Sequence, residues 1–183
     1  MSLLNSVLKI FVGDKQQKDL KLLQPIVTKS NSFENAISNL SNDELRAKSE
    51  EFKAKIKAAT KSFDDKIAEL EIEANSADID RQENIYTEID SLKDQAYEAS
   101  EALLLEIMAE AFSVVKETAK RFTQNTQVEV TASTLDRELS AIRDHVTLIG
   151  DKSIWSNSWD AAGQAIVWNM IHYDVQLIGG SVL

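Results

Sequence analysis

The sequence contains no cysteine, one proline and only five glycines among 183 residues. The absence of cysteine excludes a disulfide framework, a thiolate zinc site and a cysteine nucleophile, and it fits a reducing compartment such as the cytosol. Average proteins contain about 12% glycine plus proline, so this backbone has few natural helix breakers. Because 43% of the residues are hydrophobic, the chain can bury a core, and it is expected to do so mainly with long helices.

Long apolar runs and a dense basic face are also missing. No stretch approaches the roughly 20 apolar residues that a membrane-spanning helix needs, and no signal-peptide pattern opens the chain. The formal net charge is −10, with 30 acidic against 20 basic residues. Nucleic-acid binding requires clustered positive charge, so no nucleic-acid partner is expected. Positive charge prevails only in residues 1–30, which carry five lysines and two aspartates.

Motifs of common catalytic sites are absent as well. The only histidines are His145 and His172, no histidine pair has zinc-binding spacing, and no Gly-x-Ser-x-Gly elbow is present. The run from Gly150 to Ser153 has the composition of a phosphate loop, but its lysine does not follow a glycine directly. We interpret it as a turn, so neither a hydrolase nor a metalloenzyme is predicted from these residues.

The first residues have the pattern of a short amphipathic helix. Ser2 is a plausible N-cap, Gly13 a stop, and Lys9 lies among the apolar positions. A basic helix with one apolar face can lie in an anionic membrane interface, and the apolar positions together with Lys9 are the candidate membrane-binding residues. Packing of the same face on the chain's own core or on a second copy is the other interpretation. The apolar positions at helical spacing are Leu3, Leu4, Val7, Leu8 and Phe11.

A second helix is expected over residues 19–28, with Pro25 near its start or at a kink. Ser41 and Glu44 then form a capping box, which predicts that a long helix begins at Asn42. Two apolar stripes recur at steps of three, four and seven residues, and residues 75–78 lie between them as a turn. The stripes are Leu45, Phe52, Ile56, Phe63, Ile67 and Leu70, followed by Ile85, Ile89, Leu92, Ala96, Ala99 and Leu103.

These stripes predict two long helices that fold back as an antiparallel pair, although a coiled coil with a partner has the same spacing. The helical region after the second stripe should end near Thr123. A short strand at residues 128–132 is expected next, followed by a helix marked by Leu135, Leu139, Ile142 and Val146. A tight hairpin around Gly150 and Asp151 should come after it. Three tryptophans at 155, 159 and 168 are read as a minor core rather than a ligand platform.

Three separated blocks of the sequence are distinctive. Residues 41–52 read SNDELRAKSEEF, residues 110–121 read EAFSVVKETAKR, and residues 172–183 read HYDVQLIGGSVL. Together these blocks resemble the SecA family of bacterial preprotein translocase ATPases. The last block is the most specific of the three. Residues 58–107 are longer than the family usually has, and residues 123–168 have no counterpart in its common pattern. Both are interpreted as lineage-specific insertions.

The resemblance implies a mainly α fold with long antiparallel helices, a small β-hairpin insertion, and part of a P-loop helicase-like motor domain. It also implies that the chain is the N-terminal part of a longer protein and that this part ends before the phosphate loop. The expected regions are N-terminal amphipathic helices at 1–30, a helical region with the hairpin insertion at 31–122, a small α+β insertion at 123–168, and a nucleotide-binding segment at 169–183.

In this family the glutamine at position 176 would hydrogen-bond the adenine edge, because an amide offers both a donor and an acceptor. The resemblance places Met170, Ile171 and Tyr173 around the base. Arginine is common in the family where Ile171 stands, and phenylalanine where Tyr173 stands. On the residues alone, Gln176 is equally an ordinary amide on a helix surface.

The family resemblance implies an ATP-driven motor that uses ATP and Mg²⁺ and pushes unfolded preproteins through a SecYEG-type channel from the cytoplasmic side of the inner membrane. An anionic membrane surface and a homodimer are further implied partners. No ATPase activity is expected from these 183 residues alone, since groups that stabilise phosphoryl transfer are absent. The alternative is a non-enzymatic helical scaffold that binds a partner.

Overall fold

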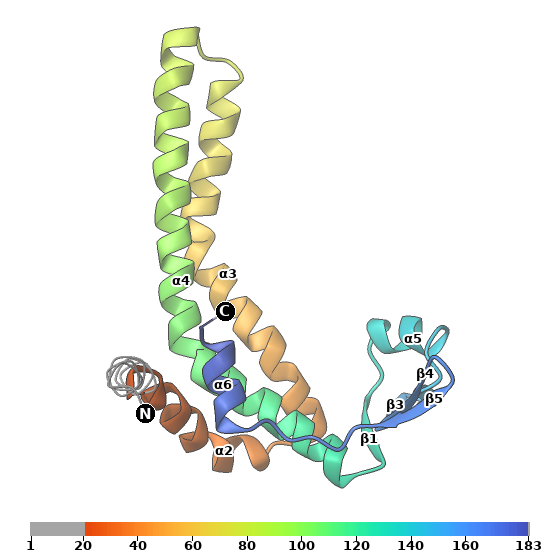
Figure 1. The fold of residues 1–183 in the computed structure, drawn as a ribbon. Coiled ribbons are helices and arrows are strands. Elements are labelled where there is room, and N and C mark those ends of the chain that lie inside the picture. Colours follow the sequence, from red (N-terminus) through yellow and green to blue (C-terminus); the bar gives the residue numbers. More distant parts are fainter. Residues whose placement is uncertain (1–20, 183) are drawn as a thin grey trace, which may run out of the picture. The chain divides into compact units, whose positions relative to one another are not determined.

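The computed structural model describes residues 21–182 (Figure 1). The chain divides into two compact units, one formed by Arg46–Met108 and the other by the segments up to Leu45 and from Ala109. In chain order the labelled elements are α2 (Glu34–Ser38), α3 (Asn42–Ala74), α4 (Ile79–Gln124), β1 (Gln127–Thr131), α5 (Thr134–Ser140), β2 (Val146–Ile149), β3 (Lys152–Ser156), β4 (Ser158–Ala161), β5 (Gln164–Val167) and α6 (Asp174–Gly180).

The first described residues are helical from 21 to 32, and the helix continues through Pro25. It therefore runs beyond the predicted end at residue 28. Val27 is completely buried and Ile37 of α2 nearly so, which anchors this part of the chain in its unit. The predicted amphipathic helix at the N-terminus, with its candidate membrane-binding residues, lies outside the described residues.

The predicted start of α3 is confirmed in detail. The Ser41 Oγ accepts from the Glu44 N–H at 3.2 Å, and the Glu44 carboxylate accepts from the Ser41 N–H at 2.7 Å. This reciprocal pair satisfies two backbone donors that a helix start leaves free. The hydroxyl and the N–H of Ser41 also hold the pKa of Glu44 below its ordinary value, since both interactions favour the carboxylate.

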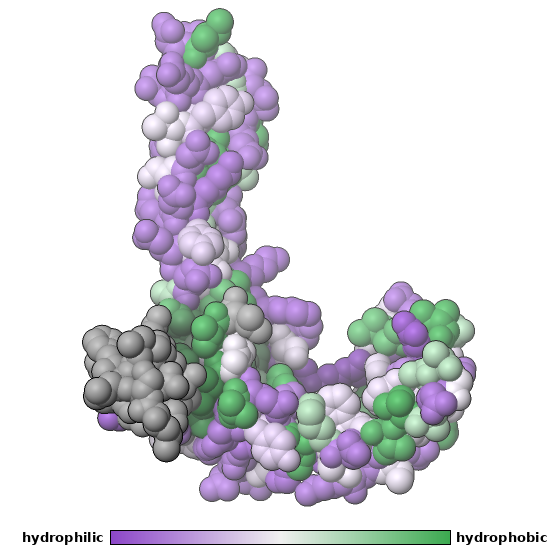
Figure 2. All heavy atoms as spheres, in the orientation of Figure 1, coloured by the Kyte–Doolittle hydropathy of each residue, from purple (hydrophilic) through white to green (hydrophobic). Residues whose placement is uncertain are grey.

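The unit of residues 46–108 is a helical hairpin. Helix α3 ends at Ala74 and α4 begins at Ile79, so the predicted turn at residues 75–78 is confirmed. Next to this turn, Leu70 and Ala74 pack with Ile85 and Ile89 in a buried cluster, and Ile67, Ala77 and Leu92 extend it. All residues of the two predicted stripes are buried or partly buried. Figure 2 shows that hydrophilic side chains cover most of the visible face of this hairpin.

The helix predicted from Leu135 to Val146 is confirmed in its first half and wrong in its second. Helix α5 ends at Ser140, Ile142 is exposed, and Val146 is the first residue of β2, where it pairs with Trp155. The spacing of the apolar residues mimicked a helical period, but the ladder to β3 satisfies the backbone of residues 146–149 instead. A capping box between Ser133 and Asp136 starts α5.

Two small antiparallel sheets follow. The predicted strand at residues 128–132 and the hairpin around Gly150 are confirmed, and the strands form one sheet in the order β1-β3-β2. Gly150 has a φ of 63°, which the first position of a two-residue hairpin turn requires. A second hairpin, β4–β5, was not predicted. Its turn holds both Ala162 and Gly163 at positive φ, at 56° and 81°.

Long-range polar contacts join the two segments that form the other unit, up to Leu45 and from Ala109. The Arg121 guanidinium donates to the carbonyl of Leu40 at 2.6 Å, to the Asn42 Oδ1 at 2.7 Å and to the Glu117 carboxylate at 3.0 Å. The Asn42 amide in turn donates to the Glu129 carbonyl at 3.0 Å. One arginine thus links α4 to the loop after α2, to the start of α3 and, through Asn42, to β1.

Candidate functional site

The residues that the family resemblance singled out lie in the segment before α6 and in its first turn. Tyr173 is the N-cap and has an extended backbone, with φ −80° and ψ 156°. Its N–H donates to the Oε1 of Gln176 at 2.8 Å. Gln176 therefore occupies the third position of the helix and closes one half of a capping box with its own side chain.

The amide group of Gln176 keeps free hydrogen-bonding capacity. Gln176 is exposed, and its Nε2 lies 3.8 Å from the Sδ of Met170, a weak acceptor. Each amide oxygen has two lone pairs and each amide nitrogen two hydrogens, so one acceptor position and one good donor position remain. Such a pair is what a purine edge with neighbouring donor and acceptor groups requires.

The structure brings Met170, Tyr173 and Gln176 together. The carbonyl of Met170 accepts from the Thr123 hydroxyl at 3.2 Å, which attaches the segment to the end of α4. The Tyr173 side chain is 72% exposed and that of Met170 is partly exposed. An aromatic ring, a thioether and an amide are thus presented to solvent within seven consecutive residues, 170–176.

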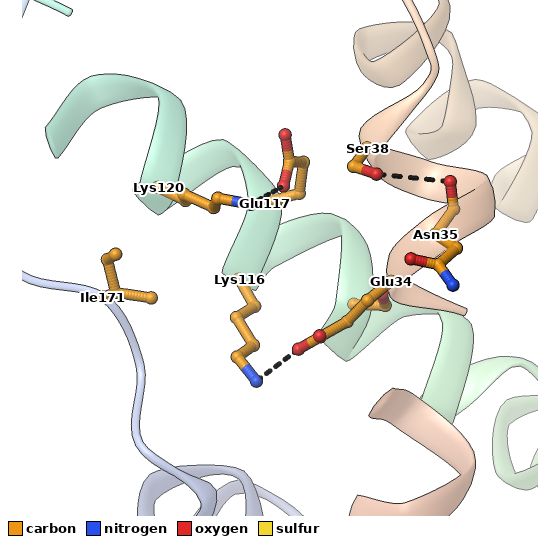
Figure 3. Close-up of a pocket in the computed structure, with 8 residues that line it drawn as sticks. Glu34, Asn35, Ser38, Lys116, Glu117, Lys120 and Ile171 are labelled. Atoms are coloured by element: carbon orange, nitrogen blue, oxygen red, sulfur yellow. Dashed lines mark hydrogen bonds and ion pairs between the residues drawn. The ribbon is translucent and has the colours of Figure 1, made fainter. Parts of the chain in front are cut away.

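Ile171 lies in different surroundings from the other three predicted residues. It lines a small polar cavity of about 120 Å³ together with residues of α2 and α4 (Figure 3). Ser113 lines the same cavity, and its buried hydroxyl has no hydrogen-bond partner among the described residues. The remaining lining residues are Glu34, Asn35, Ser38, Lys116, Glu117 and Lys120.

Lys116 connects this segment to the N-terminal helices, a contact that sequence reasoning missed. Its Nζ lies 2.5 Å from the Glu34 carboxylate, 3.1 Å from the Asn31 Oδ1 and 3.9 Å from the carboxylate of Asp174 in the first turn of α6. At the other end of α6, a Cβ added at Gly180 would meet the Phe112 ring at 3.4 Å. Helix α6 therefore packs closely on α4, and the partners lie too far apart in sequence for spacing to reveal them.

No helix within residues 21–182 is both long and apolar enough to cross a membrane. Within the same range, no three or more acidic, histidine or cysteine side chains are grouped so that they could hold a metal ion.

Comparison with known proteins gives the family. The family described as the SecA DEAD-like domain matches residues 8–183. The chain belongs to this family. The relatives include a protein translocase subunit SecA from Christiangramia forsetii, 60% identical over 181 residues that cover 98% of this chain, and one from Flavobacterium psychrophilum, 56% identical over 184 residues that cover all of it. A third, from Bacteroides fragilis, is 41% identical over 179 residues.

The chain spans 16% of the length of each of these SecA relatives. No solved structure matches it significantly. The family assignment made from three sequence blocks is confirmed, and the match extends through both segments that were interpreted as insertions. In the structure the three blocks occupy the first turns of α3, the later part of α4, and α6 with the residues before it.

Proposed function

We propose that this chain is the N-terminal part of the ATP-driven motor that moves secretory preproteins across the cytoplasmic membrane, and that residues 170–176 form the adenine-side wall of its nucleotide site. Membership in the SecA DEAD-like family supports the motor function. The observation that carries the adenine contact is Gln176, whose amide is fixed at a helix start by Tyr173 and still keeps a donor and an acceptor.

The chemistry of the neighbouring side chains fits a purine. The exposed Tyr173 ring can stack on the flat face of a base, and the Met170 thioether is a polarisable group suited to contact with an aromatic ring. Ile171 lines a cavity beside α4 instead, so we assign it to the support of the wall rather than to the base. The family commonly has arginine at this position. With isoleucine there instead, no guanidinium can stack on the base, so binding of the base should be weaker.

ATP and Mg²⁺ would be the cofactors of the whole protein. Positive groups that stabilise the transferred phosphoryl group are required for hydrolysis, and the predicted wall supplies none of them. We therefore expect the 183-residue chain alone to lack ATPase activity. We also infer that α3 and α4 pair as antiparallel helices along most of their length, since both apolar stripes are covered.

The proposed partners are a SecYEG-type channel and unfolded preproteins, with action at the cytoplasmic face of the inner membrane. The amphipathic pattern of residues 1–12, followed by lysines at 15, 18 and 21, supports binding to an anionic membrane surface, and the same face is suited to a homodimer contact. These partners belong to the whole protein, of which this chain supplies one part.

The adenine contact is tested with Gln176→Ala in the full-length protein. Loss of a hydrogen-bonded pair should weaken ATP binding about tenfold and bring the affinities for ATP and GTP closer together, as measured by isothermal calorimetry. Gln95→Ala, another exposed glutamine on a helix, is the matched control and should change neither affinity. Unchanged ATP affinity in the Gln176 variant would reject the contact and favour the scaffold interpretation.

The membrane contact is tested by deletion of residues 1–12 in the full-length protein. Co-sedimentation with vesicles that contain anionic lipid should fall, and binding of the intact protein should decrease as salt screens the lysines. Vesicles of purely zwitterionic lipid are the control. Equal sedimentation of the intact and deleted proteins would exclude a membrane role for this segment.

A further inference from the structure

Helix α4 carries an apolar stripe that the hairpin core does not use. Tyr86, Tyr97 and Leu104 are 53%, 66% and 41% exposed. Their spacings of eleven and seven residues are close to whole numbers of helical turns, so the three side chains share one side of the helix over about 27 Å. The buried stripe of Ile85 and Ile89 lies about a quarter turn away.

A stripe of carboxylates runs beside these apolar residues. Acidic residues recur at steps of seven, four and seven, and all of them are exposed. Three of these carboxylates precede Tyr86, Tyr97 and Leu104 by three residues, which makes them direct neighbours on the helix surface. The acidic stripe consists of Glu83, Asp90, Asp94 and Glu101.

Most of this negative charge is not compensated. Within residues 21–182 no lysine or arginine lies within ion-pair distance of Glu83, Asp94 or Glu101, and the nearest contact of Asp90 is with Lys93 at 3.9 Å. Residues 64–106 contain fourteen acidic and three basic residues. The start of the same hairpin differs, because lysines at 48, 53 and 55 there form close ion pairs with Glu50 and Glu51.

The hairpin itself gains little from either stripe. Exposed tyrosines contribute little burial, and like charges one turn apart on a helix repel each other. A second copy of the chain would bring another acidic surface to this side, which disfavours self-association there. A partner with the opposite charge relieves the repulsion and covers the apolar side chains at once.

We propose that this side of α4, defined by Tyr86, Tyr97 and Leu104 with the acidic stripe beside them, docks a basic amphipathic helix of another protein. The apolar face of that helix packs on the two tyrosines and Leu104, and its lysines or arginines pair with the carboxylates. Only three large side chains are offered, so the interface is smaller than that of a stable complex. Binding is therefore reversible, in the micromolar range, and sensitive to salt.

The probe is a labelled 18-residue peptide of leucine and lysine, with the leucines on one helical face. Its affinity for the 183-residue chain is measured by fluorescence anisotropy. A scrambled peptide of the same composition has no apolar face and should bind at least tenfold more weakly. The double variant Tyr86→Ser and Tyr97→Ser should lower the peptide affinity at least tenfold, and Ile72→Ser, a change at another exposed apolar residue of the hairpin, should leave it unchanged.

Charge is tested in the same assay. The variant with Asp94→Asn and Glu101→Gln should weaken binding and flatten its salt dependence. Neutralisation of the exposed Glu138 and Asp144, which lie in the other unit, is the matched control. If both peptides bound equally, or if the tyrosine changes had no effect, the peptide would be held only by unspecific charge attraction. Either result would overturn the proposal.

Self-association is the remaining outcome. In sedimentation velocity, the chain alone should not dimerise through this surface as its concentration rises. A dimer that Tyr97→Ser abolishes would make a second copy the occupant and would likewise overturn the proposal. Neither result depends on the adenine site, because the peptide assay involves no nucleotide.

Discussion

The two units of the chain are held together by different interactions. In the hairpin of residues 46–108, apolar stripes supply the core, and most ion pairs join residues three or four positions apart on one helix. In the other unit, Arg121, Lys116 and Asp43 bind partners about 80 residues away in sequence. The segment proposed to contact adenine lies in this second unit, which long-range polar contacts hold together.

This difference has a functional meaning. A hairpin with a repeated stripe tolerates changes in length and surface, because each turn depends mainly on its neighbours. A nucleotide-contacting segment must hold its side chains within a fraction of an ångström, and long-range polar contacts supply that precision. The hairpin is therefore suited to vary and to present a docking surface, and the other unit to position Gln176.

Ile89→Ala should give the largest effect on the hairpin. Ile89 is 1% exposed in its buried cluster, so the change should lower the free energy of unfolding by about 3 kcal/mol. Ile72→Ala, at an exposed position of α3, is the matched control and should cost less than 0.5 kcal/mol, roughly. Urea unfolding followed by circular dichroism measures both.

The same experiment tests whether the units unfold independently. All three tryptophans lie between residues 155 and 168, in the other unit, so their fluorescence reports on that unit. The Ile89→Ala change should shift the dichroism transition and leave the fluorescence transition in place. An equal shift of both signals would mean that the two units unfold as one.

Arg121→Met should have the next largest effect and act on the other unit. The side chain is 14% exposed and donates to a carbonyl, an amide and a carboxylate, so its loss should cost about 2 kcal/mol. Arg81→Met removes an arginine whose ion pair with Glu73 is largely exposed, and should cost less than about 1 kcal/mol. Tryptophan fluorescence during urea unfolding should detect the first change. Equal costs for the two arginines would show that long-range contacts contribute no more than local ones.

Ala162→Asn should stabilise the β4–β5 hairpin. Ala162 has a φ of 56°, in the left-handed region that alanine rarely adopts and asparagine tolerates. The gain should be roughly 0.5 kcal/mol, since asparagine has a smaller cost at this turn position. The exposed Ala165→Asn change on β5 has no such backbone demand and serves as the control. A stabilisation of similar size at both positions would exclude the turn as its cause.

The smallest effect concerns pH. Hydrogen bonds from Ser41 keep the pKa of Glu44 lower in the folded state than in the unfolded chain. The stabilisation is therefore complete above the ordinary pKa of glutamate and is lost as the pH falls through the lowered value. Unfolding of the chain and of its Glu44→Ala variant should differ at neutral pH and converge at acidic pH, once the pH is below the lowered pKa of Glu44. Glu71→Ala controls for the loss of one negative charge, and a pH-independent difference for Glu44→Ala would contradict the capping contribution.

Elements with a local cause were predictable. The Ser41 cap, the turn at 75–78 and the Gly150 hairpin depend on residues within a few positions of each other. The helix predicted through Val146 failed because a ladder with β3 competed with the apparent helical period. The β4–β5 hairpin was missed because its turn places an alanine, rather than asparagine or glycine, at positive φ.

Residue identity and helical period alone define the family, the long helices with their apolar stripes, and the acidic surface of the hairpin. Only the folded chain shows that Lys116 reaches both Glu34 and Asp174, that Ile171 lines a cavity beside α4, and that the amide of Gln176 caps its own helix. Side chains far apart in sequence meet only after the backbone has folded, and one side chain has several possible partners until packing selects among them.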